Sequence, residues 1–127
     1  MLERTFHLVV PEQWNKRPVA EWAPRSLALE GFIHASLAPQ LRGTLAAHYA
    51  DESRLYLLEL CPLRTADAMR LEPSRDGALF PHLHRALEPD DILRHWKLRA
   101  RGRSWNLPRF AEKPESDNPS GHPGPPR

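Results

Sequence analysis

The sequence has a single cysteine, Cys61, among its 127 residues. An internal disulfide is therefore excluded, and this cysteine usage indicates a reducing compartment, so the cytoplasm is the expected location. No apolar run approaches the roughly 20 residues of a membrane span. Residues 1–5 lack the basic region and apolar stretch that begin a secretory signal. We expect a soluble protein with no membrane partner.

Several common phosphate and metal motifs are also missing. There is no Walker loop and no G-x-G-x-x-G opening a helix, so neither P-loop nor Rossmann nucleotide binding is indicated. The histidines are not accompanied by acidic or cysteine ligands at a recognised metal-binding spacing, so no metal is expected. Cys61 precedes Pro62 without a basic neighbour, which indicates a small core residue rather than a nucleophile.

The composition is that of one soluble globular domain. Hydrophobic residues make up 40% of the chain and charged residues 27%, with a formal net charge of +2. We expect residues 1–110 to form that domain. Residues 111–127 are rich in proline and lack large apolar side chains, so they are expected to form a disordered tail.

Segments rich in β-forming residues recur along the chain, with few helices long enough to cross between parallel strands. This pattern predicts an α+β fold with mostly antiparallel strands, and helices in the N-terminal half. Gly31 fits a bulge in the second strand. The expected strands are Thr5–Val10, about Leu27 to His34, Leu55–Leu60, Met69–Glu72, Ala78–Leu83 and Ile92–Leu98, and the expected helices are Glu12–Arg17, Val19–Trp22 and Pro39–Ala50.

The last strand and the loop after it lack acidic residues. Between Ile92 and Arg109 there are six basic residues and no Asp or Glu. Such a run is suited to phosphates or to an anionic partner such as RNA. It is also what a solvated edge strand with a trailing loop looks like. Within the strand, Ile92, Arg94, Trp96 and Leu98 are expected on one face.

The segment Gly31–Ser36 combines an imidazole and a hydroxyl at the end of an apolar run. Residues two apart on a strand share a face, so His34 and Ser36 are expected to address one ligand together. Two other interpretations stay open: Ser36 caps the turn into the next helix, and His34 is a satisfied core histidine. If the first strand lies beside His34, then His7 lines the same cleft.

The segment Leu71–His84 gathers a carboxylate, a hydroxyl, a guanidinium and two imidazoles between apolar residues. Arg75 is suited to hold a phosphate or a carboxylate, and Glu72 to accept from a ribose hydroxyl. Ser74 and His82 are candidates for the same ligand site, and His84 follows on the face of His82. The alternative is an ordinary ion pair between Glu72 and Arg75 in a turn.

These two segments resemble the signatures of the family called domain of unknown function 952. The matching residues are Phe-Ile-His-x-Ser from Phe32 and Glu-Pro-Ser-Arg-x-Gly-x-Leu-Phe-Pro-His-Leu from Glu72, and the similarity runs from about Phe6 to Leu98. The chain departs from the family pattern at Leu71, where an aromatic residue is common, and at His84-Arg85, where Tyr-Gly is common.

The resemblance implies a fold similar to that of ADP-ribosyltransferases and of NAD-dependent RNA 2′-phosphotransferases, with a split antiparallel sheet and NAD bound in the cleft. It places His7 at a first-strand histidine that contacts ribose, and His34 with Ser36 at the end of the second strand. Glu72 takes the place of the acidic residue of the transferases. A likeness of fold does not itself confer an activity.

Three hypotheses about function follow. The first is an NAD-dependent ADP-ribosyl transferase-like enzyme with Glu72 and His34 as catalytic residues, and with His7, Ser36, Ser74, Arg75 and His82 binding NAD. The second is a non-catalytic module that binds a small anionic ligand or RNA through Arg75 and the basic stretch. The third gives the histidines a structural role and leaves function to a partner surface.

Overall fold

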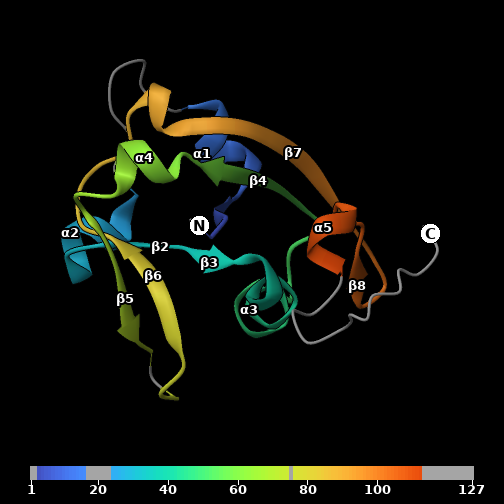
Figure 1. The fold of residues 1–127 in the computed structure, drawn as a ribbon. Coiled ribbons are helices and arrows are strands. Elements are labelled where there is room, and N and C mark those ends of the chain that lie inside the picture. The colour runs from blue at the N-terminus through green and yellow to red at the C-terminus, as the bar shows by residue number, and fades with distance from the viewer. Residues whose placement is uncertain (1–2, 17–23, 75, 113–127) are drawn as a thin grey trace.

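The computed structural model describes residues 3–16, 24–74 and 76–112, and it has a mixed α+β architecture (Figure 1). Its strands form two antiparallel sheets, one of five strands and one of three. The predicted class, α+β with antiparallel strands, is therefore confirmed. Within the described ranges no helix is both long and apolar enough to cross a bilayer.

The five-stranded sheet has the order β3-β1-β4-β7-β8, so its central strands come from distant parts of the chain. β4 pairs with β1 on one side and with β7 on the other, and it is almost completely buried after its first residue. Its run of leucines explains that position, because a strand covered on both faces needs apolar side chains at successive positions. The bounds are β1 Thr5–Val9, β3 Ser36–Leu37, β4 Arg54–Leu60, β7 Ile92–Arg101 and β8 Ser104–Trp105.

The smaller sheet has the order β2-β6-β5. β6 is the middle strand and pairs antiparallel with both neighbours. The predicted hairpin of Met69–Glu72 with Ala78–Leu83 is confirmed to within one residue at most ends. The bounds are β2 Ile33–His34, β5 Met69–Pro73 and β6 Leu79–Leu83.

The helices are short. Three α-helices of the described residues lie in the N-terminal half, where helices were expected. Pro11 and Pro62 stand at the first turns of α1 and α4, where the missing N–H costs nothing. The bounds are α1 Pro11–Asn15, α2 Arg25–Glu30, η1 Ala38–Gln40, α3 Leu41–His48, α4 Pro62–Thr65, η2 Pro89–Asp91 and α5 Arg109–Glu112. The helix predicted over Val19–Trp22 lies outside the described residues. Of the predicted tail, residues 113–127 also lie outside them, and residues 111 and 112 form the end of α5.

The strand predicted from about Leu27 is wrong. This segment forms α2, and only Ile33 and His34 are extended. Gly31 is not a bulge but the residue that ends the helix: its φ is +89°, and its N–H donates to the Leu27 carbonyl. Glycine takes this left-handed conformation without steric cost, which is why it commonly terminates helices.

Apolar side chains pack on both faces of the five-stranded sheet. One face, with Phe6, Leu57 and Leu98, is covered by Leu41 and Leu45 of α3. The other face packs against the three-stranded sheet; the residues of that cluster are Val9, Trp14, Ile33, Leu58, Leu60, Ala68, Leu83 and Leu87. The smaller sheet thus depends on the larger one for its core.

A register shift in β7 changes one predicted face. Ile92 is opposite Leu60, whereas Arg94 is opposite Glu59, so Leu93 is the extra residue of a bulge. As a result Ile92 packs with the cluster around Leu60, and Trp96 packs on the opposite face. The expectation that Ile92 shares a face with Arg94, Trp96 and Leu98 is wrong because the bulge breaks the two-residue period.

Asp91 is a fully buried carboxylate where β7 begins. It accepts hydrogen bonds from Arg85 at 2.7 Å, from Arg64 at 3.4 Å and from the Glu88 backbone N–H at 2.8 Å. Burial alone would raise the pKa of the Asp91 carboxyl, but the hydrogen bonds from Arg85 and Glu88 outweigh it, and the pKa is lowered. Asp91 therefore fixes the segment that follows β6 against the start of β7.

We expect Asp91→Asn to lower the free energy of unfolding by about 3 kcal/mol, because it leaves Arg85 beside a buried amide in place of its counter-ion. Urea unfolding at pH 7 measures the loss. Asp90→Asn, at the exposed neighbouring position, is the control and should change stability by under about 0.5 kcal/mol. Equal effects of the two substitutions would contradict the role given to Asp91.

Candidate functional site

One face of the three-stranded sheet carries a cluster of aromatic and titratable side chains. Alternation along β2 and β6 sends Ile33 and Leu83 into the core, and sends His34 and His82 to the opposite face. His34 and His82 are directly opposite each other in the register, and their ring centroids are 5.7 Å apart. The structure thus brings together imidazoles from two segments that are far apart in the sequence.

Glu72 of β5 is the anion of this cluster. Its Oε1 accepts a hydrogen bond from His82 Nδ1 at 2.8 Å and another from His84 Nε2 at 2.9 Å. These bonds, with that of His84 the larger influence, hold the pKa of the Glu72 carboxyl below its usual range. Glu72 Oε2 accepts no hydrogen bond from a described residue, and the Glu72 side chain keeps 33% of its surface exposed. One oxygen is fixed by two imidazoles, and the side chain as a whole is partly exposed.

Phe32 orders the imidazoles. Its ring stacks on His82 with centroids 3.9 Å apart and planes 13° apart, and it meets the His34 ring edge-on at 4.9 Å. His82 is consequently buried, while His34 keeps 58% of its side chain exposed and bonds through Nε2 to Glu30 of α2. His82 is therefore clamped between Phe32 and Glu72, whereas His34 is accessible to a ligand.

Three members of this face were not singled out as site residues from the sequence: Phe32, Glu30 and Arg70. Arg70 is opposite His82 in the β5–β6 register and is exposed, two residues before Glu72 on the same strand face. The two-residue period of β5 was the available signal, since it places Arg70 with Glu72. Glu30 gave no such signal because its segment was expected to be a strand.

His7 lies behind the cluster. It is 8% exposed, and its Nδ1–H donates to the backbone carbonyl of His34 at 2.7 Å. Burial lowers the pKa of His7 to about 4, against the smaller opposing influence of the hydrogen bond to the His34 carbonyl. His7 is thus neutral at pH 7 and supports the backbone of His34. β1 pairs with β3 rather than with β2, so His7 and His34 do not lie side by side on neighbouring strands.

The expectation that His34 and Ser36 share one ligand is wrong. His34 belongs to the three-stranded sheet and Ser36 to the five-stranded sheet. Ser36 is buried, and its hydroxyl is hydrogen-bonded to the Thr44 hydroxyl of α3 at 3.0 Å. The chain passes from one sheet to the other at Ala35, so the rule of alternate residues on one strand does not apply across it.

The turn between β5 and β6 is stabilised by its own polar groups. The Ser74 hydroxyl donates to Asp76 at 2.7 Å, and the Gly77 N–H donates to the Ser74 carbonyl. Arg75 lies outside the described residues, so its predicted pairing with Glu72 is not described. The partners that the structure gives to Glu72 are the two histidines.

Within the described ranges, no group of three or more His, Cys, Asp and Glu residues is arranged to hold a metal ion. His82 Nδ1 and His84 Nε2 point at the same carboxylate oxygen instead.

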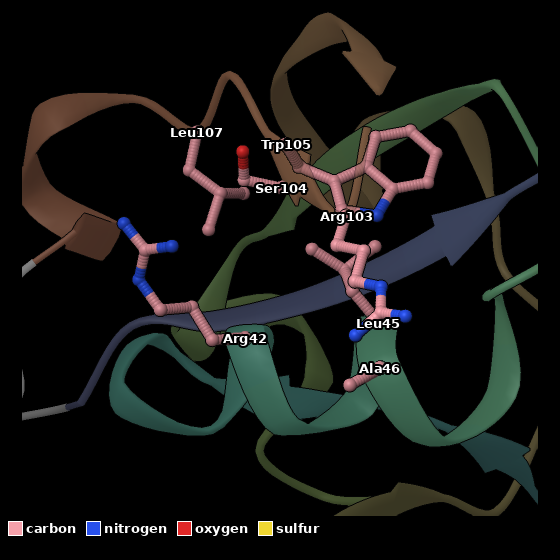
Figure 2. A pocket seen from close by; sticks show the side chains of 7 residues that line it. All are labelled: Arg42, Leu45, Ala46, Arg103, Ser104, Trp105 and Leu107. Carbon is pink, nitrogen blue, oxygen red and sulfur yellow. The ribbon is translucent and has the colours of Figure 1, made fainter. Parts of the chain in front are cut away.

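A hollow lies away from this cluster, between α3 and the β7–β8 turn (Figure 2). The guanidinium groups of Arg42 and Arg103 lie on opposite sides of it. Neither arginine has a carboxylate within 4.0 Å among the described residues. The full lining is Arg42, Leu45, Ala46, Arg103, Ser104, Trp105 and Leu107. The sequence interpretation had included Arg103 only as part of the basic stretch.

The fold and the site define a small α+β protein with two packed antiparallel sheets and a histidine–glutamate cluster on the outer face of the smaller one. The chain belongs to the family described as protein of unknown function DUF952, whose model matches residues 8–95. That range includes both the His34 and the Glu72 segments. No curated protein matches the chain.

Solved structures of one protein share the fold. A crystal structure of protein CC0527 from Caulobacter crescentus is 26% identical, with a TM-score of 0.70, and the match covers 79% of this chain and 90% of that one. A crystal structure of a CC0527 double mutant gives a TM-score of 0.69 with the same identity and coverage. The solution NMR structure of CC0527 is 27% identical, with a TM-score of 0.63, and the match covers 77% and 86% of the two chains. The structure of this chain is therefore similar to that of CC0527 over most of both chains.

We expect His7 to make the protein less stable as the pH falls from 6.5 to about 4. In this window the unfolded chain binds a proton at His7 and the folded chain does not, so the free energy of unfolding decreases with falling pH, by about 3 kcal/mol in total. Urea unfolding at pH 7 and at pH 4.5 measures the difference.

The substitution His7→Gln should remove most of this pH-dependent loss, whatever its effect on stability at pH 7. His48→Gln, at an exposed position of α3, should leave the loss as in the parent. An unchanged pH dependence in His7→Gln would show that His7 is not held neutral by burial.

Proposed function

We propose that the histidine–glutamate cluster binds a nucleotide of the NAD type and carries out ADP-ribosyl transfer. The observation that supports this is the state of Glu72, which is ionised, has one oxygen held by two imidazoles, and keeps 33% of its side chain exposed. In such a transfer, positive charge develops on the ribose as nicotinamide departs. A fixed carboxylate beside that carbon stabilises the charge without having to reorganise.

The step is a substitution at ribose C1′. The bond from C1′ to the nicotinamide nitrogen breaks, and its electron pair leaves with nicotinamide. A lone pair of an acceptor hydroxyl or of water forms the new bond to C1′. The proton of that nucleophile passes to His34 Nδ1, since His34 Nε2 is engaged with Glu30.

The other side chains take binding and positioning roles in this proposal. His82 is buried against Phe32 and bonds to Glu72, so its role in this proposal is to position that carboxylate. Arg70, on the same face, is suited to the pyrophosphate because a guanidinium donates to two phosphate oxygens at once. His7 acts through the His34 backbone and is a positioning residue. Ser36, bonded to Thr44, has no part in the proposed contacts.

Calorimetry with NAD, ADP-ribose and nicotinamide tests binding, and chromatography of released nicotinamide tests turnover. We expect Glu72→Gln to weaken NAD binding about tenfold, since a charge-assisted hydrogen bond is lost, and to reduce nicotinamide release to background. Glu52→Gln, an exposed carboxylate before β4, is the matched control and should behave as the parent. Absence of heat with all three ligands at millimolar concentration would refute the proposal.

The second candidate is a non-catalytic module for a small anionic ligand, and the hollow in Figure 2 favours it. Its lining holds the guanidinium groups of Arg42 and Arg103, which have no carboxylate within 4.0 Å among the described residues, together with Ser104 and Trp105. Cations on opposite sides of a hollow attract a phosphate or a carboxylate between them.

Calorimetry with inorganic pyrophosphate checks this candidate. Arg42→Gln/Arg103→Gln should weaken binding at least tenfold, whereas Arg25→Gln/Arg94→Gln, which removes the same charge elsewhere, should not. Equal losses in the two double variants would mean that net charge alone attracts the anion. Retained NAD binding in Arg42→Gln/Arg103→Gln would assign the nucleotide to the histidine–glutamate cluster.

A further inference from the structure

The basic stretch of the sequence divides between two faces in the structure, and on one of them its charges have no carboxylate partner in the part of the chain that the structure describes. β7 pairs with β4 in a register that puts Arg99 opposite Arg54 and Lys97 opposite Tyr56. Because side chains alternate, Lys97, Arg99 and Arg101 share the face of Arg54. We call these four residues, Arg54, Lys97, Arg99 and Arg101, the basic face; all four are exposed.

The carboxylate of these two strands lies on the other face. Glu59 is the single acidic residue of β4, β7 has none, and Glu59 pairs with Arg4 at 2.8 Å and with Arg94 at 3.4 Å. No residue of the basic face has a carboxylate within 4.0 Å among the described residues. Arg54 and Arg99 are directly opposite, an arrangement that destabilises a sheet when nothing neutralises it. The folded protein therefore concentrates positive charge here at some cost in stability.

The shape of the basic face suits a linear polyanion. Alternate residues of a strand are about 6.7 Å apart, so Lys97, Arg99 and Arg101 form a straight row of cations, with Arg54 beside it. The row continues to the β7–β8 turn at Gly102, whose φ is +60°, and β4 begins on the same side of the molecule (Figure 1). Toward the other end of the row lies exposed His95, which packs on Tyr56 with ring centroids 5.9 Å apart.

We propose that the basic face binds a single strand of nucleic acid, with Lys97, Arg99 and Arg101 on successive phosphates, Arg54 on the same backbone beside Arg99, and a base stacked near His95 and Tyr56. A row of cations beside an aromatic group is the arrangement by which single strands are bound without sequence preference. The face is only two strands wide, which matches one backbone rather than two. This surface lies on the larger sheet and is independent of the nucleotide proposed at Glu72.

Fluorescence anisotropy with labelled twelve-nucleotide oligouridine, at 50 to 200 mM NaCl, tests the proposal. Four phosphate contacts predict a slope of log K against log [salt] of about −3. Arg54→Gln/Arg99→Gln should reduce that slope to about −1.4 and weaken binding about 25-fold at 0.1 M salt, since each phosphate contact contributes a factor of about five there.

Arg25→Gln/Arg94→Gln is the matched control. It removes the same charge, and Arg94 comes from β7 itself but from its opposite face, so the slope should stay near −3. Urea unfolding should show that Arg54→Gln/Arg99→Gln is at least as stable as the parent, because it relieves a repulsion. A loss of oligouridine binding in Arg54→Gln/Arg99→Gln, with stability intact, supports direct contact of these arginines with the phosphates.

Three results would overturn the proposal: equal slopes in the two double variants, tighter binding of a duplex of the same length, or full competition by polyglutamate. The last would assign the surface to an acidic protein instead. Unchanged NAD binding by Arg54→Gln/Arg99→Gln separates this surface from the histidine–glutamate cluster.

Discussion

The extended segment from Ile33 to Leu37 joins the two sheets, and the arrangement of the site depends on it. Ile33 and His34 pair with β6, whereas Ser36 and Leu37 pair with β1. Between them the Ala35 N–H donates to the Pro81 carbonyl at 3.0 Å, so the backbone stays hydrogen-bonded through the crossing. Two residues of this segment therefore belong to one sheet and two to the other, and neither sheet can shift relative to the other without breaking these bonds.

This crossing also determines which side chains face the solvent. Ile33 is fully buried between the sheets, and its neighbours Phe32 and His34 are consequently directed to the outer face. The His34 carbonyl points the other way and accepts a hydrogen bond from the Nδ1–H of His7, which is itself buried. Core packing and a buried hydrogen bond thus hold the backbone beneath an exposed imidazole. Pre-organised support of this kind is what a binding or catalytic group requires.

Secondary structure could be predicted from the sequence where a single hydrophobic pattern extends over a whole segment. The strands around Leu57 and His82 and the antiparallel α+β class could be predicted, because continuous or alternating apolar patterns are properties of single elements. His82 was expected near Glu72 because both belong to one short segment, whereas the nearness of His34 was only a hypothesis. His84, held only as a further member of its strand face, proved to be one of the two partners of Glu72.

What failed depended on contacts between elements. The segment before Gly31 has apolar residues that fit either a helix or a strand, and its short helix buries none of its residues fully and ends at the left-handed Gly31. The bulge at Leu93 depends on how β7 meets β4, and the separation of His34 from Ser36 depends on a second sheet that no local pattern reveals. Register and sheet membership are tertiary properties, so the side chains they orient could not be assigned from spacing alone.

The charges of the molecule argue for separate binding surfaces rather than one continuous site. An ionised Glu72 repels phosphates, and on its own face Arg70 is the described cation without a carboxylate partner. The basic face and the hollow carry cations that meet no carboxylate among residues 3–16, 24–74 and 76–112. A long polyanion is therefore expected to bind more tightly on the larger sheet, where several phosphates meet several cations. The histidine–glutamate cluster is better suited to a ligand that has hydroxyl donors, a developing positive charge and few phosphates. The distribution of charge thus supports the proposal of a nucleotide at one surface and of a nucleic acid strand at the other.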